Sequence, residues 1–240
     1  MPATVSPQVS IVIPVYNEEA ILEAAVKDLV DRLQTFGFEY ELILAENGSR
    51  DATVKLGTEL SQRFPQVRIF SLGEPNYGKA LKRGIEQARG EIVICDEIDL
   101  CDTDFYKRAL PLLHAGKADL VVGSKVLDSS SDERPFMRHF ATLVINGLLR
   151  VSLGFKGTDT HGLKAFRRAS LVKVVESCIV DKDLFASELV IRAERSNQVR
   201  IQEIPVRVLE KRPPSIHLFR RVPNVLKGVA RLVIAIRVKG

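Results

Sequence analysis

Three carboxylates lie within four residues of one another, directly after a short apolar run. Residues 92–94 (Ile-Val-Ile) are typical of a buried strand in a parallel sheet, and Asp96, Glu97 and Asp99 follow them. Because side chains alternate along an extended chain, Glu97 and Asp99 are expected to face the same side. Carboxylates gathered at a strand's carboxyl end, where α/β sheets bind ligands, repel each other unless a cation joins them. The stretch therefore predicts a divalent-cation site, with an acidic, solvated loop as the alternative.

The composition is that of an ordinary globular protein. The chain has 240 residues, of which 45% are hydrophobic and 27% are charged, so one large domain can bury a substantial core. No apolar run approaches the roughly 18 residues of a membrane span, and residues 1–7 do not resemble a secretory signal. Cys95, Cys101 and Cys178 lack the paired spacing of a metal site or a disulfide framework. These features predict a cytoplasmic protein.

The net charge of +5 is concentrated at one end of the chain. Residues 212–240 contain seven Lys or Arg and no acid, which leaves 28 basic and 30 acidic residues in the first 211. We therefore divide the chain into a domain at 1–211 and a basic segment at 212–240. The segment's only aromatic residue is Phe219, too little for base stacking, which argues against nucleic acid. Its apolar blocks predict one amphipathic helix from about Leu218, or two with a break near Pro223. Such a helix would make peripheral contact with an anionic membrane or pack on its own domain.

Strand-like and helical patterns alternate over residues 10–123. Apolar strand-like runs lie at 10–14, 41–45, 67–72, 92–94 and 119–123, and helical patterns lie at about 21–36, up to 64, 80–89 and 103–115. This alternation predicts an α/β fold with a doubly wound, mostly parallel sheet and helices on both faces. Beyond it, we expect helices at 136–153, 170–175 and 185–195, a polar turn at 158–162, and a strand at 199–209 interrupted by Pro205.

Four segments, taken in their order and spacing, resemble one family. They are residues 13–18 (Ile-Pro-Val-Tyr-Asn-Glu), 46–53 (Glu-Asn-Gly-Ser-Arg-Asp-Ala-Thr), 76–80 (Asn-Tyr-Gly-Lys-Ala) and 90–100. Over about residues 8–217 the chain resembles the family 2 glycosyltransferases of GT-A fold. Within that family it is most similar to the polyprenyl-phosphate sugar synthases, a group that includes dolichol-phosphate mannose synthase. The resemblance implies an inverting transfer of sugar from a GDP- or UDP-sugar to a polyprenyl or dolichyl phosphate at the cytoplasmic membrane face.

The resemblance also implies roles for individual residues. Glu97 and Asp99 stand where the family has Asp-x-Asp, and would be the catalytic pair that holds Mg²⁺ or Mn²⁺ on the donor diphosphate. The cation would offset the charge that builds on the departing nucleoside diphosphate. Lys79 would meet a donor phosphate or be a solvated residue, and Asp96 would be a donor contact or a capping residue. The remaining donor-binding residues implied are Pro14, Tyr16, Asn17, Glu18, Glu46, Asn47, Gly48, Ser49 and Ile98.

The chain departs from the family pattern at three places. Glu46-Asn47 replaces the usual Asp-Asp, Glu97 replaces the first Asp of Asp-x-Asp, and Cys101 stands where many polyprenyl-phosphate synthases carry a Gln at the metal site. A thiol is a poor ligand for Mg²⁺. These departures keep open a different class of protein, a non-catalytic relative that binds a nucleotide sugar.

Basic residues predict how the acceptor would be held. Lys125, Arg138 and Arg212 fall near positions where relatives meet the acceptor's phosphate, with plain surface charge as the alternative. A phosphate acceptor is already ionised at neutral pH and needs no general base. A sugar or small-molecule hydroxyl would need one, and Asp159 is then the candidate. A glycosyltransferase acting on such a soluble acceptor is the alternative enzyme, and the oligomeric state is left open.

Overall fold

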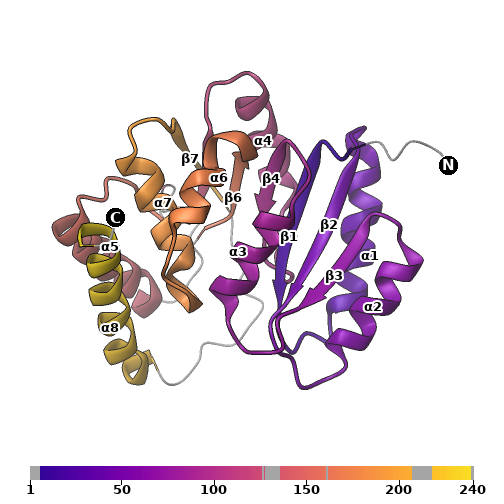
Figure 1. Ribbon diagram of the computed structural model, residues 1–240, viewed down its shortest axis with the longest axis horizontal. Coiled ribbons are helices and arrows are strands. Elements are labelled where there is room, and N and C mark those ends of the chain that lie inside the picture. Colours follow the sequence, from indigo (N-terminus) through magenta and orange to yellow (C-terminus); the bar gives the residue numbers. More distant parts are fainter. Residues whose placement is uncertain (1–5, 126, 128–135, 161, 207–217, 239–240) are drawn as a thin grey trace.

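The protein is built on one mixed sheet of seven strands (Figure 1). The computed structural model describes residues 6–125, 127, 136–160, 162–206 and 218–238. Their sheet has the order β3-β2-β1-β4-β6-β5-β7, in which only β6 runs antiparallel to its neighbours. The strands are β1 (Val9–Val15), β2 (Tyr40–Glu46), β3 (Val67–Ser71), β4 (Ile92–Cys95), β5 (Leu120–Ser124), β6 (Lys164–Arg167) and β7 (Ile201–Pro205). The predicted α/β fold with a mostly parallel sheet is confirmed.

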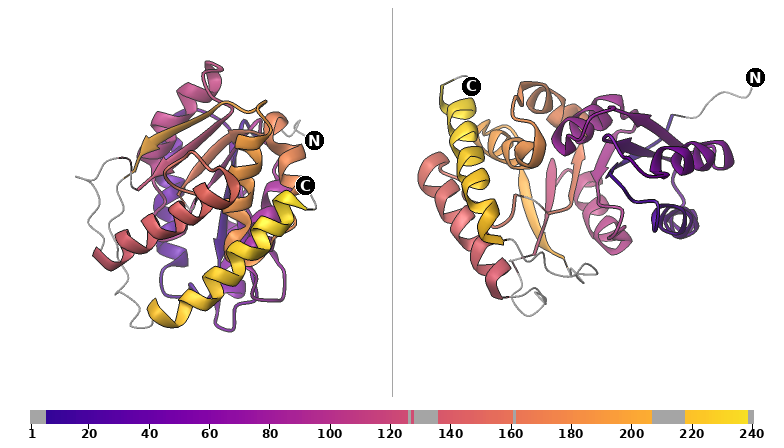
Figure 2. Two further views of the ribbon diagram at one scale, coloured as in Figure 1. Left: turned by 90° about the vertical axis from the view of Figure 1, so that its left-hand side faces the viewer. Right: turned by 90° about the horizontal axis from the view of Figure 1, so that it is seen from below.

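Helices cover both faces of the sheet, because side chains of each strand alternate between two apolar cores (Figure 2). Ile11 and Ile13 of β1 belong to the core under α1, α2 and α4, whereas Val12 belongs to the core under the other helices. The helices are α1 (Leu22–Leu33), α2 (Thr53–Arg63), α3 (Tyr77–Gln87), α4 (Thr103–His114), α5 (Phe136–Leu153), α6 (Arg168–Ser177), α7 (Phe185–Arg195) and α8 (Leu218–Arg237), with short 3-10 turns η1 (Gln34–Phe36) and η3 (Lys182–Leu184).

Helix α3 and strand β6 differ from the sequence prediction, and helix α8 matches one of its two alternatives. Helix α3 begins at Tyr77 rather than near Ala80, since the Asn76 side chain caps it by accepting a 3.0 Å hydrogen bond from the Lys79 N–H. Strand β6 was not predicted, because its four residues include a lysine and follow a polar turn. Helix α8 runs through Pro223 without a break, which leaves the single-helix alternative.

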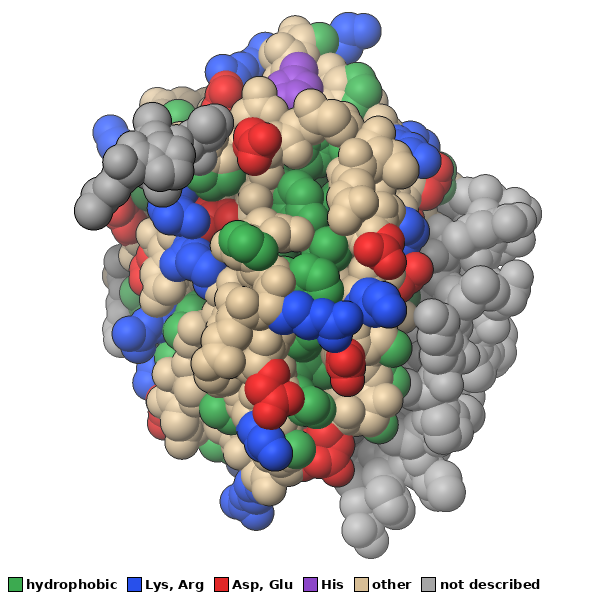
Figure 3. All heavy atoms as spheres, turned by 90° about the vertical axis from the view of Figure 1, so that its right-hand side faces the viewer, with side chains coloured by type: hydrophobic (Ala, Val, Ile, Leu, Met, Phe, Trp, Pro, Cys, Tyr) green, Lys and Arg blue, Asp and Glu red, His purple; other side chains and the backbone are tan. Residues whose placement is uncertain are grey.

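Helix α8 packs beside α5 at one end of the molecule (Figure 2). It buries Val229, Leu232 and Ile236, whereas Leu226 and Ile234 are half exposed. Within the described residues, no helix is long and apolar enough to span a bilayer. The opposite end of the molecule, with α1, α2 and β3, carries acidic and basic side chains interspersed over its surface (Figure 3).

Candidate active site

Loops at the carboxyl ends of β1, β2 and β4 enclose a cavity of about 490 Å³ together with the start of α3 and η3. This is the sheet edge where α/β proteins bind ligands. The cavity is lined by Pro14, Tyr16, Glu18, Asn47, Pro75, Asn76, Tyr77, Glu97, Ile98, Asp99 and Lys182. Seven of these residues were predicted from the sequence, and they come from three of the four segments that carry the family resemblance. The structure therefore brings these seven of the predicted donor and metal residues to one place.

The loops after β1 and β2 are fastened to each other by hydrogen bonds. The Asn17 N–H donates to Ser49 Oγ at 2.9 Å, and the Arg50 N–H donates to Asn17 Oδ1 at 2.8 Å. Asn17 has a φ of 54°, in the left-handed region that Asn tolerates better than most residues. Gly48 has a φ of 82°, and a Cβ there would lie 2.6 Å from the carbonyl carbon of Glu74. Asn17, Gly48 and Ser49 thus shape the loops from outside the set of lining residues.

The two residues at the end of β2 face in different directions. Glu46 is fully buried, and its carboxylate accepts hydrogen bonds from the Ser49 N–H and the Ser71 hydroxyl. Asn47 lines the cavity and donates from Nδ2 to the Val15 carbonyl at 3.1 Å. In this arrangement Glu46 supports the loop, and Asn47 presents its surface to the cavity.

The acidic stretch after β4 is a turn rather than an extended chain. The Glu97 carbonyl accepts from the N–H groups of Leu100 and Cys101, each at 3.0 Å. The prediction that Glu97 and Asp99 share one side of an extended chain was wrong. A tight turn nevertheless places both residues on the lining of one cavity, with Ile98 buried between them in the sequence.

Asp96 lies beneath this turn and not on the cavity lining. Its buried carboxylate accepts from the Glu97 N–H at 2.6 Å, from the Asp102 N–H at 3.0 Å, and from the Tyr106 hydroxyl. Burial raises the pKa of the Asp96 carboxyl to about 7, against the lowering effect of these donors. Cys101 is also buried, with a φ of 45°, and burial raises the pKa of its thiol. Both side chains hold the turn in shape from below.

The lining residues are compatible with a hard divalent cation. Magnesium in nucleotide enzymes is commonly held by one or two carboxylates together with substrate phosphates, and Glu97 and Asp99 supply two carboxylates on one cavity. The described part of the chain contains no cluster of three or more His, Cys, Asp or Glu side chains suited to a metal. Glu97 and Asp99 are thus the two carboxylates that this turn offers to a cation.

Two of the predicted phosphate-binding residues, Lys79 and Lys125, are not on the lining of this cavity. Lys79 is more than half exposed, and its Nζ forms an ion pair with Glu74 at 2.6 Å, which raises the pKa of the lysine. Lys125 follows β5, and its backbone N–H donates to Asp159 Oδ2 at 3.3 Å. The Arg138 side chain and all of Arg212 lie outside the described residues.

Asp159 is held in a polar turn next to β6. Its carboxylate is buried and also accepts the Gly162 N–H at 3.1 Å. Lys164, at the start of β6, is buried and donates from Nζ to the Gly162 carbonyl at 2.7 Å. Burial lowers the pKa of Lys164, whereas Asp159 and Glu97 raise it. Sequence reasoning assigned no role to this lysine.

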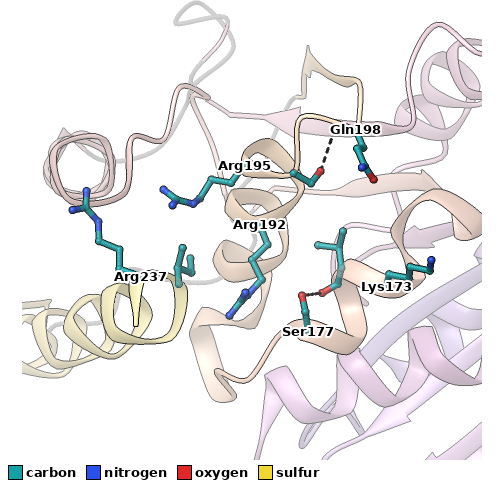
Figure 4. Close-up of a pocket in the computed structure, with 9 residues that line it drawn as sticks. Lys173, Ser177, Arg192, Arg195, Gln198 and Arg237 are labelled. Carbon is teal, nitrogen blue, oxygen red and sulfur yellow. Dashed lines mark hydrogen bonds between the residues drawn. The ribbon is translucent and has the colours of Figure 1, made fainter. Parts of the chain in front are cut away.

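A second cavity, of about 660 Å³, lies between α6, α7 and α8 and is lined by four basic residues. In Figure 4 the charged ends of Lys173, Arg192 and Arg195 point in three different directions. Arg192 pairs with Glu188 at 2.8 Å and donates to the Ala235 carbonyl, and Arg195 donates to the Leu153 carbonyl. Arg192 and Arg195 thus bond to carbonyl groups near the ends of α8 and α5, and their side chains do not converge on one point where a ligand could bind.

Comparison with known proteins gives relatives along nearly the whole chain. Glycosyltransferase AglD from Haloferax volcanii is 28% identical over 93% of this chain and 36% of its own length. Dolichyl-phosphate beta-glucosyltransferase ALG5D from Trichomonas vaginalis is 29% identical over 82% of this chain and 64% of its own length. The chain thus spans less than two thirds of either relative.

A solved structure shares the fold. Glucosyl-3-phosphoglycerate synthase from Mycobacterium tuberculosis, in complex with UDP, superimposes with a TM-score of 0.66 at 21% identity, covering 95% of this chain and 80% of that chain. The same enzyme has been solved with Mn²⁺, UDP and glucosyl-3-phosphoglycerate. The model of the family described as "Glycosyl transferase family 2" matches residues 10–175, more than half of the chain. The chain belongs to glycosyl transferase family 2 and has the GT-A fold.

Proposed function

We propose that the protein is an inverting glycosyltransferase that moves a sugar from a GDP- or UDP-sugar to a polyprenyl or dolichyl phosphate. The observation that carries this proposal is the single cavity lined by Glu97, Asp99, Tyr16 and Asn47 at the carboxyl edge of the sheet. Membership of the family supports sugar transfer, and the name of the Trichomonas relative supports a lipid-linked phosphate as the acceptor.

The donor's nucleoside would lie against the loops after β1 and β2. Tyr16 is 39% exposed, so its ring can cover the base, and the neighbouring Asn47 and Glu18 can hydrogen-bond to base or ribose. The bonds between Asn17, Ser49 and Arg50 fix these loops before the donor arrives. Binding would therefore cost little ordering of the protein.

Glu97 and Asp99 would hold Mg²⁺ or Mn²⁺ against the donor diphosphate. When bound, the cation would neutralise charge on the departing nucleoside diphosphate. The chain's own contribution is to keep both carboxylates in place, through the 97–100 turn and the buried Asp96 beneath it. This support is rigid, because the Asp96 carboxylate is buried and accepts hydrogen bonds from three donors.

Three basic residues would receive the acceptor. Lys125, together with Arg138 and Arg212, would bind the lipid-linked phosphate and orient its oxygen toward the sugar's anomeric carbon. The phosphate oxygen carries negative charge at neutral pH, so this reaction needs no general base. A hydroxyl acceptor would lose a proton, and Asp159 beside Lys125 is the group that could accept it.

The α5–α8 end of the molecule would contact the membrane. Val144, Leu148 and Val151 on α5 are exposed, as are Leu226, Ile234 and Val238 at α8. Lys227 and Arg231 are exposed on α8 as well, within the basic segment 212–240. Exposed apolar residues with cations beside them suit the interface of an anionic bilayer. We place the protein at the cytoplasmic face, attached peripherally by these helices.

The reaction tests the proposal directly. Purified protein with Mn²⁺ or Mg²⁺ should release UDP or GDP from a sugar nucleotide only when a polyprenyl phosphate is present. Release with a soluble sugar as acceptor would instead support the hydroxyl-transferring alternative. Donor binding that is indifferent to metal, with no release for any acceptor, would support a non-catalytic protein and contradict the enzymatic proposal.

A further inference from the structure

Among the described residues that line the cavity with Glu97 and Asp99, Lys182 is the one basic residue. Lys182 begins η3, more than eighty residues along the chain from the acidic turn, yet it lines the same cavity as Glu97 and Asp99. We propose that Lys182 binds the diphosphate of the nucleotide donor. This inference rests on the proposed function and adds to it the residue that holds the phosphates.

The cavity lining has more negative than positive side chains, so a bound diphosphate would need a cationic partner there. Glu18, Glu97 and Asp99 bring three carboxylates to the lining, and of the described residues that line it, Lys182 alone carries positive charge. A nucleoside diphosphate carries two to three further negative charges at neutral pH. The two positive charges of a divalent cation would balance the two carboxylates of Glu97 and Asp99. The negative charge of the diphosphate would then still need a positive partner. A lysine on the same cavity supplies it, as a flexible point charge suited to phosphate.

The backbone at Lys182 is held in an unusual conformation. Its φ is 58°, in the left-handed region where residues other than glycine are uncommon. Such conformations persist where the surroundings impose them, often at ligand sites. Here the Lys182 N–H donates to Asn76 Oδ1 at 2.9 Å, and Asn76 Nδ2 donates to Asp181 Oδ2 at 3.0 Å. One buried asparagine on the cavity lining therefore fixes the position of this lysine.

The start of α3 is shaped to receive the same segment. A Cβ at Gly78 would lie 2.8 Å from the Lys182 backbone nitrogen and 2.8 Å from Phe185 Cβ, and closer still to the Lys182 carbonyl oxygen. Only glycine allows this approach. Gly78 belongs to the 76–80 segment that carries the family resemblance, and Lys79 of that segment pairs instead with Glu74, outside the lining residues. The segment thus positions Lys182 rather than presenting its own lysine to the cavity.

Calorimetry on the full chain tests the inference. UDP and GDP are titrated with Mn²⁺ into the parent protein and into Lys182→Met, Lys182→Arg, Lys182→Gly and, as a matched control, Lys173→Met on the exposed surface of α6. Uridine and guanosine, which lack phosphates, are titrated as well. Melting temperatures report on folding. Lys182→Gly removes the charge while suiting the left-handed backbone, so it separates loss of charge from loss of structure.

We expect Lys182→Met and Lys182→Gly to weaken binding of the nucleoside diphosphate about tenfold, the scale of one charge-assisted hydrogen bond. Nucleoside binding should not change, Lys182→Arg should retain most of the affinity, and Lys173→Met should match the parent. Equal diphosphate affinity in parent and Lys182→Met would overturn the inference while leaving the donor site intact. Equal losses for nucleoside and diphosphate would overturn it too. If the parent binds neither UDP nor GDP, the proposed function fails along with the inference.

Discussion

Replacing Gly78 by alanine tests whether the segment containing Lys182 is seated on α3 as the structure has it. The added methyl would overlap backbone atoms of Lys182, which cannot rotate away as a flexible side chain can. Inserting a methyl into a packed contact costs about 1–3 kcal/mol. If the segment moves away instead, the two hydrogen bonds of Asn76 to Lys182 and Asp181 are lost, at about 1 kcal/mol each. Both routes predict a loss of about 2 kcal/mol of unfolding free energy.

Urea unfolding monitored by circular dichroism measures this loss, and donor affinity is measured on the same samples. Gly147→Ala is the matched control, because a Cβ at that helical glycine meets nothing within 4 Å. It should gain up to about 1 kcal/mol from helix propensity. A Gly78→Ala protein as stable as its parent, with unchanged donor affinity, would refute the described contact between α3 and η3.

Three further predictions concern chemistry, pH and the membrane. Asp99→Asn should lower sugar transfer at least about a hundredfold with an unchanged melting temperature, since it removes one carboxylate from the proposed cation site; transfer at the parent rate would contradict the enzymatic role of that site. Arg200 donates to Asp119 and holds the pKa of that carboxyl at about 2, below its ordinary value. The pair therefore stabilises the fold fully above about pH 4, and its contribution is lost as the pH falls toward 2. Arg200→Gln should therefore lower the melting temperature at pH 7 but hardly at pH 2, and an equal loss at both would refute the linkage. Ile234→Ser should weaken sedimentation with anionic vesicles without altering donor affinity, whereas undiminished binding would remove α8 from the proposed membrane surface.

Local patterns were enough to predict the strands and helices of the donor half. Residues 10–14 and 41–45 are continuous apolar runs because both faces of these strands are covered, and the structure extends each of them by one residue at both ends. The conformation of the acidic turn was not predictable in the same way. It depends on Asp96, which accepts one hydrogen bond from the neighbouring Glu97 N–H and gains its other two only when Asp102 and Tyr106 fold back over the end of β4.

Lys182 could not be found from spacing, for a related reason. Its neighbour on the cavity, Asn76, is 106 residues away in the sequence, and the signal that joins them is the glycine at position 78. The sequence pattern alone predicts that this glycine belongs to a turn followed by a helix. Its real constraint is a backbone that approaches from η3, which only the assembled chain shows.

The direction of β6 has a consequence for how this scaffold can accommodate different acceptors. Since β6 runs against β4 and β5, its first residue, Lys164, pairs with Cys95 and Val122 near the ends of those strands. The chain therefore leaves the sheet after Ser124 and re-enters it on the same rim, with α5 in between. An excursion that departs and returns at one rim can change in length or sequence without shifting any strand register. The loops after β1, β2 and β4 that form the donor cavity would keep their structure, while changes between β5 and β6 suit the protein to a different acceptor.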